Sequence, residues 1–169
     1  IAVSKATRLV LEGSGVPGDK IDVVYSATDL ALYDVPVDVA AVRREFQVPD
    51  THRIVGKVAN YLKWKGYDVF LEAAARILRE EPGITFLCVG KDSEHGAAMQ
   101  DKARTLGIAD RIRFTGFRTD VPRLFAAMDV SVNCSLEGEG VAGVLRESLA
   151  AGVPVVAADV GGNREVAQE

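Results

Sequence analysis

The sequence has few of the residues that would mark it as a metalloprotein, a membrane protein or a nucleic-acid-binding protein. It has two cysteines and two histidines, and neither His52 nor His95 stands beside a cysteine, which argues against a zinc site. No apolar run approaches about 18 residues, so no segment is predicted to cross a membrane. Its 24 Asp and Glu outnumber its 20 Lys and Arg, which leaves no basic excess for a nucleic-acid partner.

The sequence also lacks any D-x-D pattern, so no acidic pair of that kind is available for a metal ion, and we expect no metal. The two cysteines, Cys88 and Cys134, lie in or beside apolar runs, which predicts buried, reduced thiols in a cytoplasmic protein. Ile1 begins inside an apolar run and Glu169 falls at the start of a predicted helix. We therefore expect the chain to be part of a longer protein.

The residues that are present are those of a globular domain. Hydrophobic residues make up 48% of the chain and charged residues 26%, which is typical of one domain with a sizeable core. Short, continuous apolar runs predict strands that are buried on both faces. The predicted strands lie at residues 54–58, 85–89, 112–114, 130–132 and 153–157.

Between these strands the apolar residues follow helical spacing, which predicts helices. The first predicted helix has Phe70, Ala74, Ile77 and Leu78 on one face and ends at residues 82–83, Pro-Gly. Three further helices are marked by Met99, Ala103 and Leu106, by Leu124, Phe125 and Met128, and by Val144, Leu145 and Leu149.

This alternation predicts an α/β fold, a Rossmann-like parallel sheet with helices on both faces. Ligands of such sheets bind beyond the carboxyl ends of the strands. We expect the Rossmann-like domain at residues 52–169, after an irregular connection at 27–51. Residues 1–26 are expected to form a smaller unit, with strands at 1–3 and 21–25 around a helix.

Two stretches imitate nucleotide-binding motifs. Residues 13–18, G-S-G-V-P-G, match the dinucleotide fingerprint G-x-G-x-x-G, but a helix precedes them and a strand follows. The fingerprint requires the reverse order, so we interpret these glycines as a helix end and turn. Residues 90–92, G-K-D, follow a strand but lack the other residues of a phosphate-binding P-loop.

The most informative stretch is the predicted strand-to-helix turn at residues 135–147, with glycines at 138, 140 and 143. Glycines let the backbone approach a ligand closely, and the first amides of the helix form an anion site. Glu139 and Glu147 lie on either side of this turn, and carboxylates are good acceptors for hydroxyl groups. The combination suits a nucleotide sugar, which has phosphates between two sets of hydroxyls.

The stretch from Glu139 to Glu147 resembles the E-x7-E motif of the group 1 (family four) retaining glycosyltransferases. Residues 152–166 resemble that family's next block, G-x-P-V-V-A-x-x-x-G-G-x-x-E-V. Residues 114–121 resemble its F-x-G-x-x-x-D-V block, and Lys65 with Gly66 resembles its K-G pair. Residues 3–6 and 21–25 resemble the beginning of its second domain. These blocks stand in the family's order and cover nearly the whole chain, which makes the resemblance specific.

The resemblance implies roles for individual residues. Glu147 would accept hydrogen bonds from the donor's ribose, and Glu139 would contact the donor sugar near the reacting carbon. Lys65 would reach the diphosphate. The distal phosphate would be held by the backbone amides of Gly140, Val141 and Ala142, and the base would lie along Gly116 and Phe117, with Arg118 close by.

The sequence departs from the family pattern in two places. Asn60 stands where the family often has an arginine, so one diphosphate cation is missing or is supplied by another residue such as Lys63. Residues 90–93, G-K-D-S, replace the family's G-x-G-P, so the resemblance assigns no ligand contacts to this loop.

By resemblance, the chain is the C-terminal half of a GT-B fold, the donor-binding part of a metal-independent, retaining glycosyltransferase. The substrate would be a nucleotide-diphosphate sugar such as a UDP-, GDP- or ADP-sugar, and no cofactor is expected. A glycan or lipid-linked acceptor would bind to an N-terminal domain outside this chain, so the chain alone is expected to bind donor without transferring sugar. The resemblance also implies that the full-length protein is cytoplasmic and associates peripherally with the inner face of the membrane. A sugar-nucleotide epimerase of GT-B fold and a catalytically inactive binding homologue remain alternatives.

Overall fold

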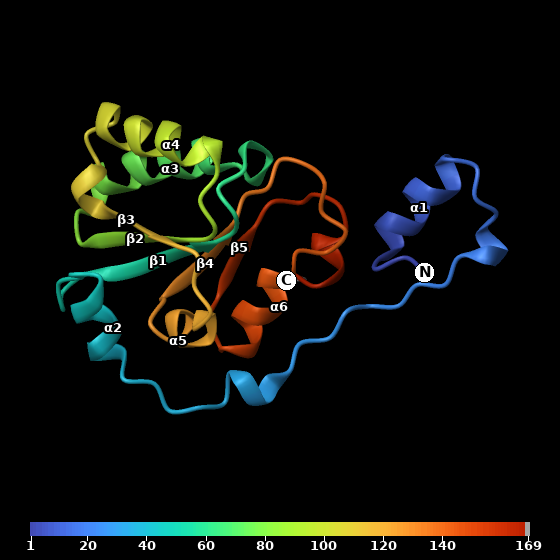
Figure 1. Cartoon of the computed structure of the whole chain (residues 1–169), viewed down its shortest axis with the longest axis horizontal. Helices are drawn as coiled ribbons and strands as arrows, with labels where there is room; N and C mark the ends of the chain where they lie inside the picture. The colour runs from blue at the N-terminus through green and yellow to red at the C-terminus, as the bar shows by residue number, and fades with distance from the viewer. Residues whose placement is uncertain (168–169) are drawn as a thin grey trace.

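The computed structural model describes residues 1–167 and contains a five-stranded parallel sheet with helices on both faces (Figure 1). The strands are β1 (Arg53–Val58), β2 (Ile84–Val89), β3 (Ile112–Gly116), β4 (Val130–Asn133) and β5 (Val155–Ala157). They lie in the order β3-β2-β1-β4-β5, and all pairs are parallel. The predicted fold class is confirmed, and the five strands predicted between residues 54 and 157 are present within about two residues.

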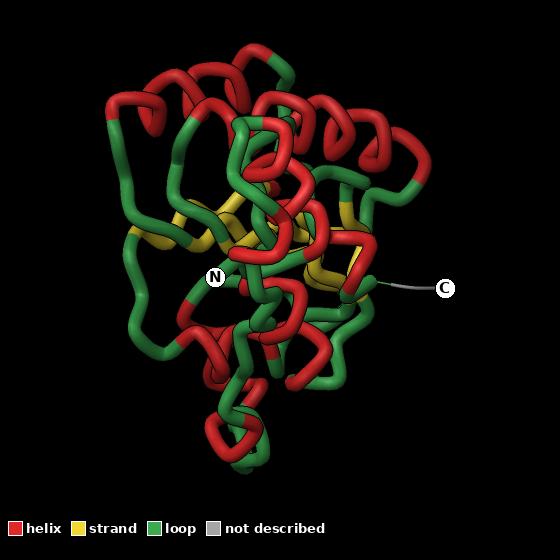
Figure 2. Tube along the Cα trace, turned by 90° about the vertical axis from the view of Figure 1, so that its right-hand side faces the viewer, coloured by secondary structure: helices red, strands yellow, loops and turns green. Residues whose placement is uncertain are grey.

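The helices form two layers around the sheet, as the tube view shows (Figure 2). On one face lie α3 (Tyr67–Glu80) and α4 (Glu94–Thr105). On the other lie α2 (Val39–Glu45), α5 (Val121–Phe125) and α6 (Gly143–Ala150). Each layer has its own core: Phe70, Leu71, Phe86 and Met99 are buried under α3 and α4, and Ile54, Leu87, Leu124 and Phe125 on the opposite face.

The amino-terminal residues form α1 (Lys5–Gly13), which lies at one side of the sheet domain (Figure 1). The predicted strands at 1–3 and 21–25 are wrong, because the two segments share only an isolated bridge between Ala2 and Val23. Two short strands that pair only with each other are marginal in water. The glycine-rich residues 13–18 end α1 and turn the chain, as predicted.

Two predicted elements are shorter than their sequence patterns. Helix α5 ends at Phe125, so Met128 lies beyond it. β5 begins after Pro154, which has no amide hydrogen for the ladder. The end of the chain contains a 3-10 turn at Asn163–Glu165, and Glu169 lies outside the described residues. Among residues 1–167, no helix has the length and apolar character that spanning a membrane requires.

Candidate functional site

The candidate site lies at the carboxyl ends of β1 and β4, which are neighbours in the centre of the sheet. From β1 the chain proceeds outward to β2 and β3, and the later strands β4 and β5 are added on the other side. The strand order therefore reverses between β1 and β4. Ligands of open α/β sheets bind at such a reversal, beyond the carboxyl ends of the strands.

A cleft of about 290 Å³ opens at this point. Its walls come from the end of β1 and the segment after it, and from the end of β4, the loop that follows and the first two turns of α6. The lining residues are Val58, Ala59, Asn60, Lys65, Asn133, Glu139, Ala142, Gly143, Val144 and Glu147. The structure thus brings together five residues that the sequence singled out: Asn60, Lys65, Glu139, Ala142 and Glu147.

Lys65 and Glu139 form an ion pair across the cleft, although they are far apart in the sequence. The Lys65 Nζ atom lies 2.6 Å from Oε1 of Glu139. The Ser135 hydroxyl donates to the same oxygen at 2.6 Å. The side chains of Lys65 and Glu139 are 18% and 8% exposed, so the pair is well shielded from water. Two donors therefore fix the orientation of the Glu139 carboxylate.

Lys65 stands on a 3-10 turn, Lys63–Lys65, that is fastened to the loop after β4. The Leu136 amide donates to the Trp64 carbonyl at 2.8 Å. The Lys65 ammonium lies 4.0 Å from the centroid of the Trp64 ring. Gly66 ends the turn in the left-handed region, with φ of 71°, and a β-carbon there would lie 1.9 Å from the Cys134 carbonyl oxygen. Only glycine permits this close approach.

Replacing Gly66 with alanine is expected to destabilise the fold strongly. A left-handed φ costs a side chain about 1 to 2 kcal/mol, and the clash with Cys134 adds roughly 1 to 3 kcal/mol. Gly107→Ala is the matched control, because Gly107 has a φ of 70° but open space around its missing β-carbon. Thermal unfolding of the two variants separates the terms, and equal losses of Tm would contradict the close packing of Gly66 on Cys134.

The amino end of α6 points into the cleft. Within the described part of the chain, the amides of Gly143 and Val144 have no hydrogen-bond partner, as expected for the first turn of a helix. The Ala142 amide was predicted to hold the distal phosphate, but it donates to Oδ1 of Asn163 at 3.1 Å. In this structure it is therefore not free for a phosphate, and Gly143 and Val144 supply the open amides.

Glu147 lies in the second turn of α6, and its side chain leans back toward the amino end of the helix. Its Oε1 atom is 3.9 Å from the point where a β-carbon on Gly143 would lie. Burial raises the pKa of Glu147, and the neighbouring Arg146 opposes this shift. Within the described residues the carboxylate has no hydrogen-bond donor, so it can accept hydroxyls from a ligand.

The remaining predicted residues lie near the cleft or away from it. Gly140 and Val141 lead into α6 without lining the cleft, and the Gly140 carbonyl accepts from the Gly162 amide at 2.9 Å. Gly116 and Phe117 lie at the end of β3, where Phe117 is 68% exposed. Arg118 is not directed at the cleft, since its guanidinium pairs with Asp120 and Glu45.

The glycine pair at 161–162 packs against the backbone of the loop that carries Glu139. A β-carbon on Gly161 would lie 1.7 Å from the Glu139 carbonyl oxygen, so the two backbones are in direct contact. Glu165 then accepts from the amides of Lys5 and Ala6, both at 2.9 Å, at the amino end of α1. This block therefore connects α1 to the loop that carries Glu139.

Ser135, Asn133 and Asn163 are site residues that the sequence analysis missed. Ser135 and Asn133 follow or end β4, so the rule that ligand contacts come after parallel strands could have found them. Asn163 carries no such signal. It is 1% exposed and joins the Ala142 amide to the Ala158 carbonyl through its side chain, which only the folded chain reveals.

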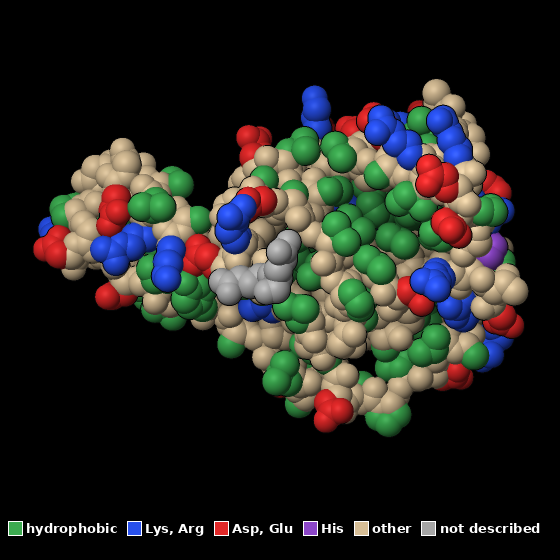
Figure 3. Space-filling view, turned by 180° about the vertical axis from the view of Figure 1, so that it is seen from behind, with side chains coloured by type: hydrophobic (Ala, Val, Ile, Leu, Met, Phe, Trp, Pro, Cys, Tyr) green, Lys and Arg blue, Asp and Glu red, His purple; other side chains and the backbone are tan. Residues whose placement is uncertain are grey.

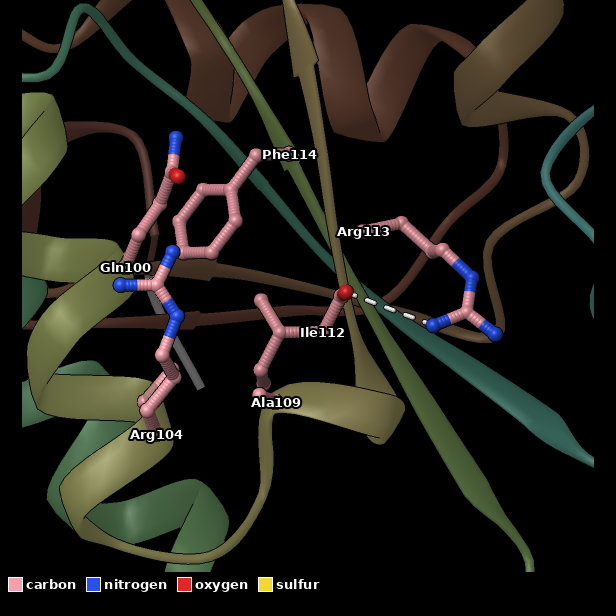
Figure 4. Close-up of a pocket in the computed structure, with 7 residues that line it drawn as sticks. Gln100, Arg104, Ala109, Ile112, Arg113 and Phe114 are labelled. Atoms are coloured by element: carbon pink, nitrogen blue, oxygen red, sulfur yellow. Dashed lines mark hydrogen bonds between the residues drawn. The ribbon is translucent and has the colours of Figure 1, made fainter.

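A second hollow, of about 360 Å³, lies beside β3 and is larger than the cleft (Figure 4). The two arginines that line it already have hydrogen-bond or ion-pair partners. Arg113 lies on the opposite side of β3 from Phe114 and donates to the carbonyls of Phe46 and Asp110. Arg104 pairs with Asp101. Because both of its arginines already have partners, this hollow is a weaker candidate than the cleft at the strand reversal.

Comparison with protein families gives a match over most of the chain. The family model for group 1 glycosyl transferases matches residues 52–169. The D-inositol 3-phosphate glycosyltransferase of Segniliparus rotundus is 34% identical over 149 residues, 85% of this chain and 32% of the relative. The enzyme of the same name from Nocardia farcinica is 35% identical over 168 residues, 94% of this chain and 37% of the relative. The chain thus spans about a third of these relatives' length.

Solved structures with the same fold include Anabaena Alr3699/HepE in complex with UDP and glucose. It is 29% identical, with a TM-score of 0.92, and the match covers 99% of this chain and 46% of that protein. The complex of the same protein with UDP-glucose gives a TM-score of 0.91. The neighbours are glycosyltransferases of GT-B fold.

Proposed function

Because this chain belongs to the group 1 glycosyl transferase family, we propose that it binds the nucleotide-sugar donor of a sugar-transfer reaction. The observation that carries the proposal is the cleft at the strand reversal. There a lysine, two free helix amides and two carboxylates converge from segments far apart in the sequence. We further propose a UDP-sugar as donor, supported by the UDP and UDP-glucose complexes of Alr3699/HepE.

The diphosphate would lie between Lys65 and the amino end of α6. The amides of Gly143 and Val144 point toward this space, and the helix dipole favours an anion there. Lys65 already pairs with Glu139, so a phosphate would compete with this carboxylate for the ammonium. Binding would therefore loosen the ion pair and leave Glu139 free to turn toward the sugar.

The hydroxyl groups of the donor would be held by the two carboxylates. The Glu147 carboxylate accepts no hydrogen bond from another group among residues 1–167, and it would accept hydrogen bonds from the ribose hydroxyls. Glu139 would contact the sugar near the carbon whose bond to phosphate breaks. Gly116 and Phe117, at the end of β3, would border the base, and Asn60 would line the phosphate side of the cleft.

The chemical step would rest on electrostatic stabilisation of the leaving group. Cleaving a glycosyl–phosphate bond develops positive charge on the sugar and negative charge on the diphosphate. Lys65 and the α6 amides are placed to stabilise that negative charge as it grows. We propose that they do so without a metal and that transfer retains the anomeric configuration. The acceptor, a glycan or a lipid-linked sugar, would bind to a part of the protein outside this chain.

Calorimetric titration of the chain with UDP, GDP, ADP and their sugars, in the presence of EDTA, tests the proposal. We expect UDP and a UDP-sugar to bind and the other nucleotides to bind much more weakly. Failure of every nucleotide to bind, with or without Mg²⁺, would contradict a donor site in this chain. Binding of UDP only with Mg²⁺ would contradict metal independence alone.

Trp64 provides a second readout of the same event, because it is the only tryptophan of the chain. Its ring contacts the Lys65 ammonium and lies beside Gly138 in the Glu139 loop. When a phosphate draws Lys65 away, the surroundings of the indole change. We expect its fluorescence to titrate with UDP at the calorimetric affinity and to be insensitive to uridine, which has no phosphate. An unchanged spectrum at saturating UDP would place the phosphates elsewhere.

A further inference from the structure

A buried lysine lies directly behind the cleft, and the proposed function does not use it. Lys57 is the last residue but one of β1 and is 1% exposed. Its ammonium lies 4.8 Å from the centroid of the Tyr67 ring and 5.9 Å from that of Phe70. Lysine is rarely buried to this degree without an acidic partner. In the described part of the chain, the only hydrogen-bond acceptor that Lys57 reaches is the Cys134 sulfur, at 3.3 Å.

Cys134 stands immediately after β4, at the start of the loop that carries Ser135 and Glu139. Its sulfur also lies 3.1 Å from the Gly66 carbonyl oxygen, next to Lys65. The residue is half-buried and borders an apolar hollow together with Val55, Phe70, Val132 and Val156. Hydrophobic side chains gather in a hollow on the back face of the molecule (Figure 3). A small uncharged molecule can therefore reach the sulfur from this side.

The two cysteines differ in how accessible they are to an oxidant. Cys88 is fully buried in β2, and burial raises the pKa of its thiol to about 12. Cysteine reacts with oxidants as the thiolate, so Cys88 is protected. Cys134 is reached from the hollow and has a lysine nitrogen within 3.3 Å. Burial lowers the pKa of Lys57, with the neighbouring Cys134 opposing the shift, which makes the neutral, nucleophilic amine easier to form.

We propose that Lys57 and Cys134 are an oxidative modification site, at which a hydroperoxide converts the pair into a sulfenamide cross-link. In the first step the Cys134 sulfur attacks one oxygen of hydrogen peroxide. An S–O bond forms, the O–O bond breaks, and the thiol proton leaves with the second oxygen as water. The sulfur is oxidised to a sulfenic acid and the peroxide is reduced.

In the second step the Lys57 amine, after losing one proton from its ammonium form to water, attacks the sulfenic sulfur. An N–S bond forms, the S–O bond breaks, and the departing hydroxide takes a proton from the nitrogen as a second water. The cross-linked chain is lighter than the reduced chain by two hydrogen atoms. Excess thiol reverses the reaction, since it reduces the N–S bond to the free cysteine and lysine.

The cross-link would act on the proposed donor site through the backbone. Drawing Cys134 from 3.3 Å to bonding distance of Lys57 displaces the residue before Ser135, which holds Glu139. It also disturbs the contact between the Cys134 sulfur and the Gly66 carbonyl, beside Lys65. Oxidation should therefore weaken donor binding, an effect that rests on the proposed function. Formation of the bond itself does not rest on it.

Mass spectrometry of the peroxide-treated chain tests the bond without any nucleotide. We expect a product lighter by two hydrogens, linked peptides that contain Lys57 and Cys134, and full recovery of the starting mass with dithiothreitol. Cys134→Ser should lose the product entirely. Lys57→Met should replace it with a sulfenic acid that dimedone traps. The wild-type measurement stands alone if either variant fails to fold.

The opposite pattern would overturn the proposal. Cys134 that accumulates as sulfenic or sulfinic acid with no peptide linked to Lys57, or that stays reduced throughout, shows that the pair is not a modification site. UDP titration of the oxidised chain then separates the two claims. A cross-linked chain that binds UDP as tightly as the reduced chain contradicts the coupling to the cleft and leaves the donor site intact.

Discussion

Glu147→Gln is expected to weaken UDP binding by roughly ten- to a hundredfold and, at neutral pH, to raise the Tm of the ligand-free chain. A hydrogen bond to a charged group contributes about 1.5 to 3 kcal/mol, and each 1.4 kcal/mol changes an equilibrium constant about tenfold. The amide of glutamine accepts less strongly than the carboxylate. Glu137→Gln is the matched control, because Glu137 is an exposed glutamate of the same loop and should change neither quantity.

The gain in stability follows from the pKa of Glu147, which burial raises. The folded chain holds this proton more tightly than the unfolded chain, so stability falls as the pH rises from the ordinary carboxyl range through the raised value. Glutamine does not titrate. The variant should therefore exceed the wild type in Tm at neutral pH, and the difference should shrink toward the ordinary carboxyl pKa. A variant less stable at every pH would contradict the absence of a hydrogen-bond donor to Glu147.

Lys65→Met is expected to weaken UDP binding about a hundredfold while uridine binding changes by less than about threefold. Lys65 is a cation that lines the cleft, and a charge-assisted contact to phosphate contributes about 1.5 to 3 kcal/mol. Uridine has no phosphate and so should not sense the change. Calorimetric titration of UDP and uridine against wild type and variant measures both effects.

Two further variants test where the diphosphate lies. Lys20→Met removes an exposed cation of the first unit that does not line the cleft, and it should leave UDP binding unchanged. Lys63→Met removes the exposed lysine that could replace the arginine missing at Asn60. If Lys63→Met weakens UDP binding as strongly as Lys65→Met, the diphosphate lies along the turn and not between Lys65 and α6. Equal losses of UDP and uridine in Lys65→Met would indicate general disruption of the cleft.

The sequence by itself determined the sheet and its connections. The inner strand β2 is a continuous apolar run because helices cover both of its faces, and helical spacing of Phe70, Ala74 and Leu145 fixed which helix faces are buried. Parallel strands with helical crossovers must carry their ligands at the carboxyl ends, so the segments after β1 and β4 were candidates from sequence alone. The Glu139 and Glu147 turn was found in this way.

Only the tertiary structure decided how these segments meet. The order β3-β2-β1-β4-β5 places β1 beside β4, which joins Lys65 to Glu139 across the cleft. Local sequence cannot encode that neighbour, because strand order depends on packing of the whole sheet. The strands predicted at 1–3 and 21–25 failed for a related reason: they lack further strands to pair with.

The partners of individual polar groups were likewise decided by the fold. The Ala142 amide is taken by Asn163, and the guanidinium of Arg118 is drawn to Glu45 and Asp120. Buried polar groups take whichever partner the folded chain brings within hydrogen-bond distance, and sequence spacing does not reveal it. The same holds for Lys57 and Cys134. A lysine in a strand and a cysteine after another strand are unremarkable in sequence, and only the pairing of β1 with β4 brings them into contact.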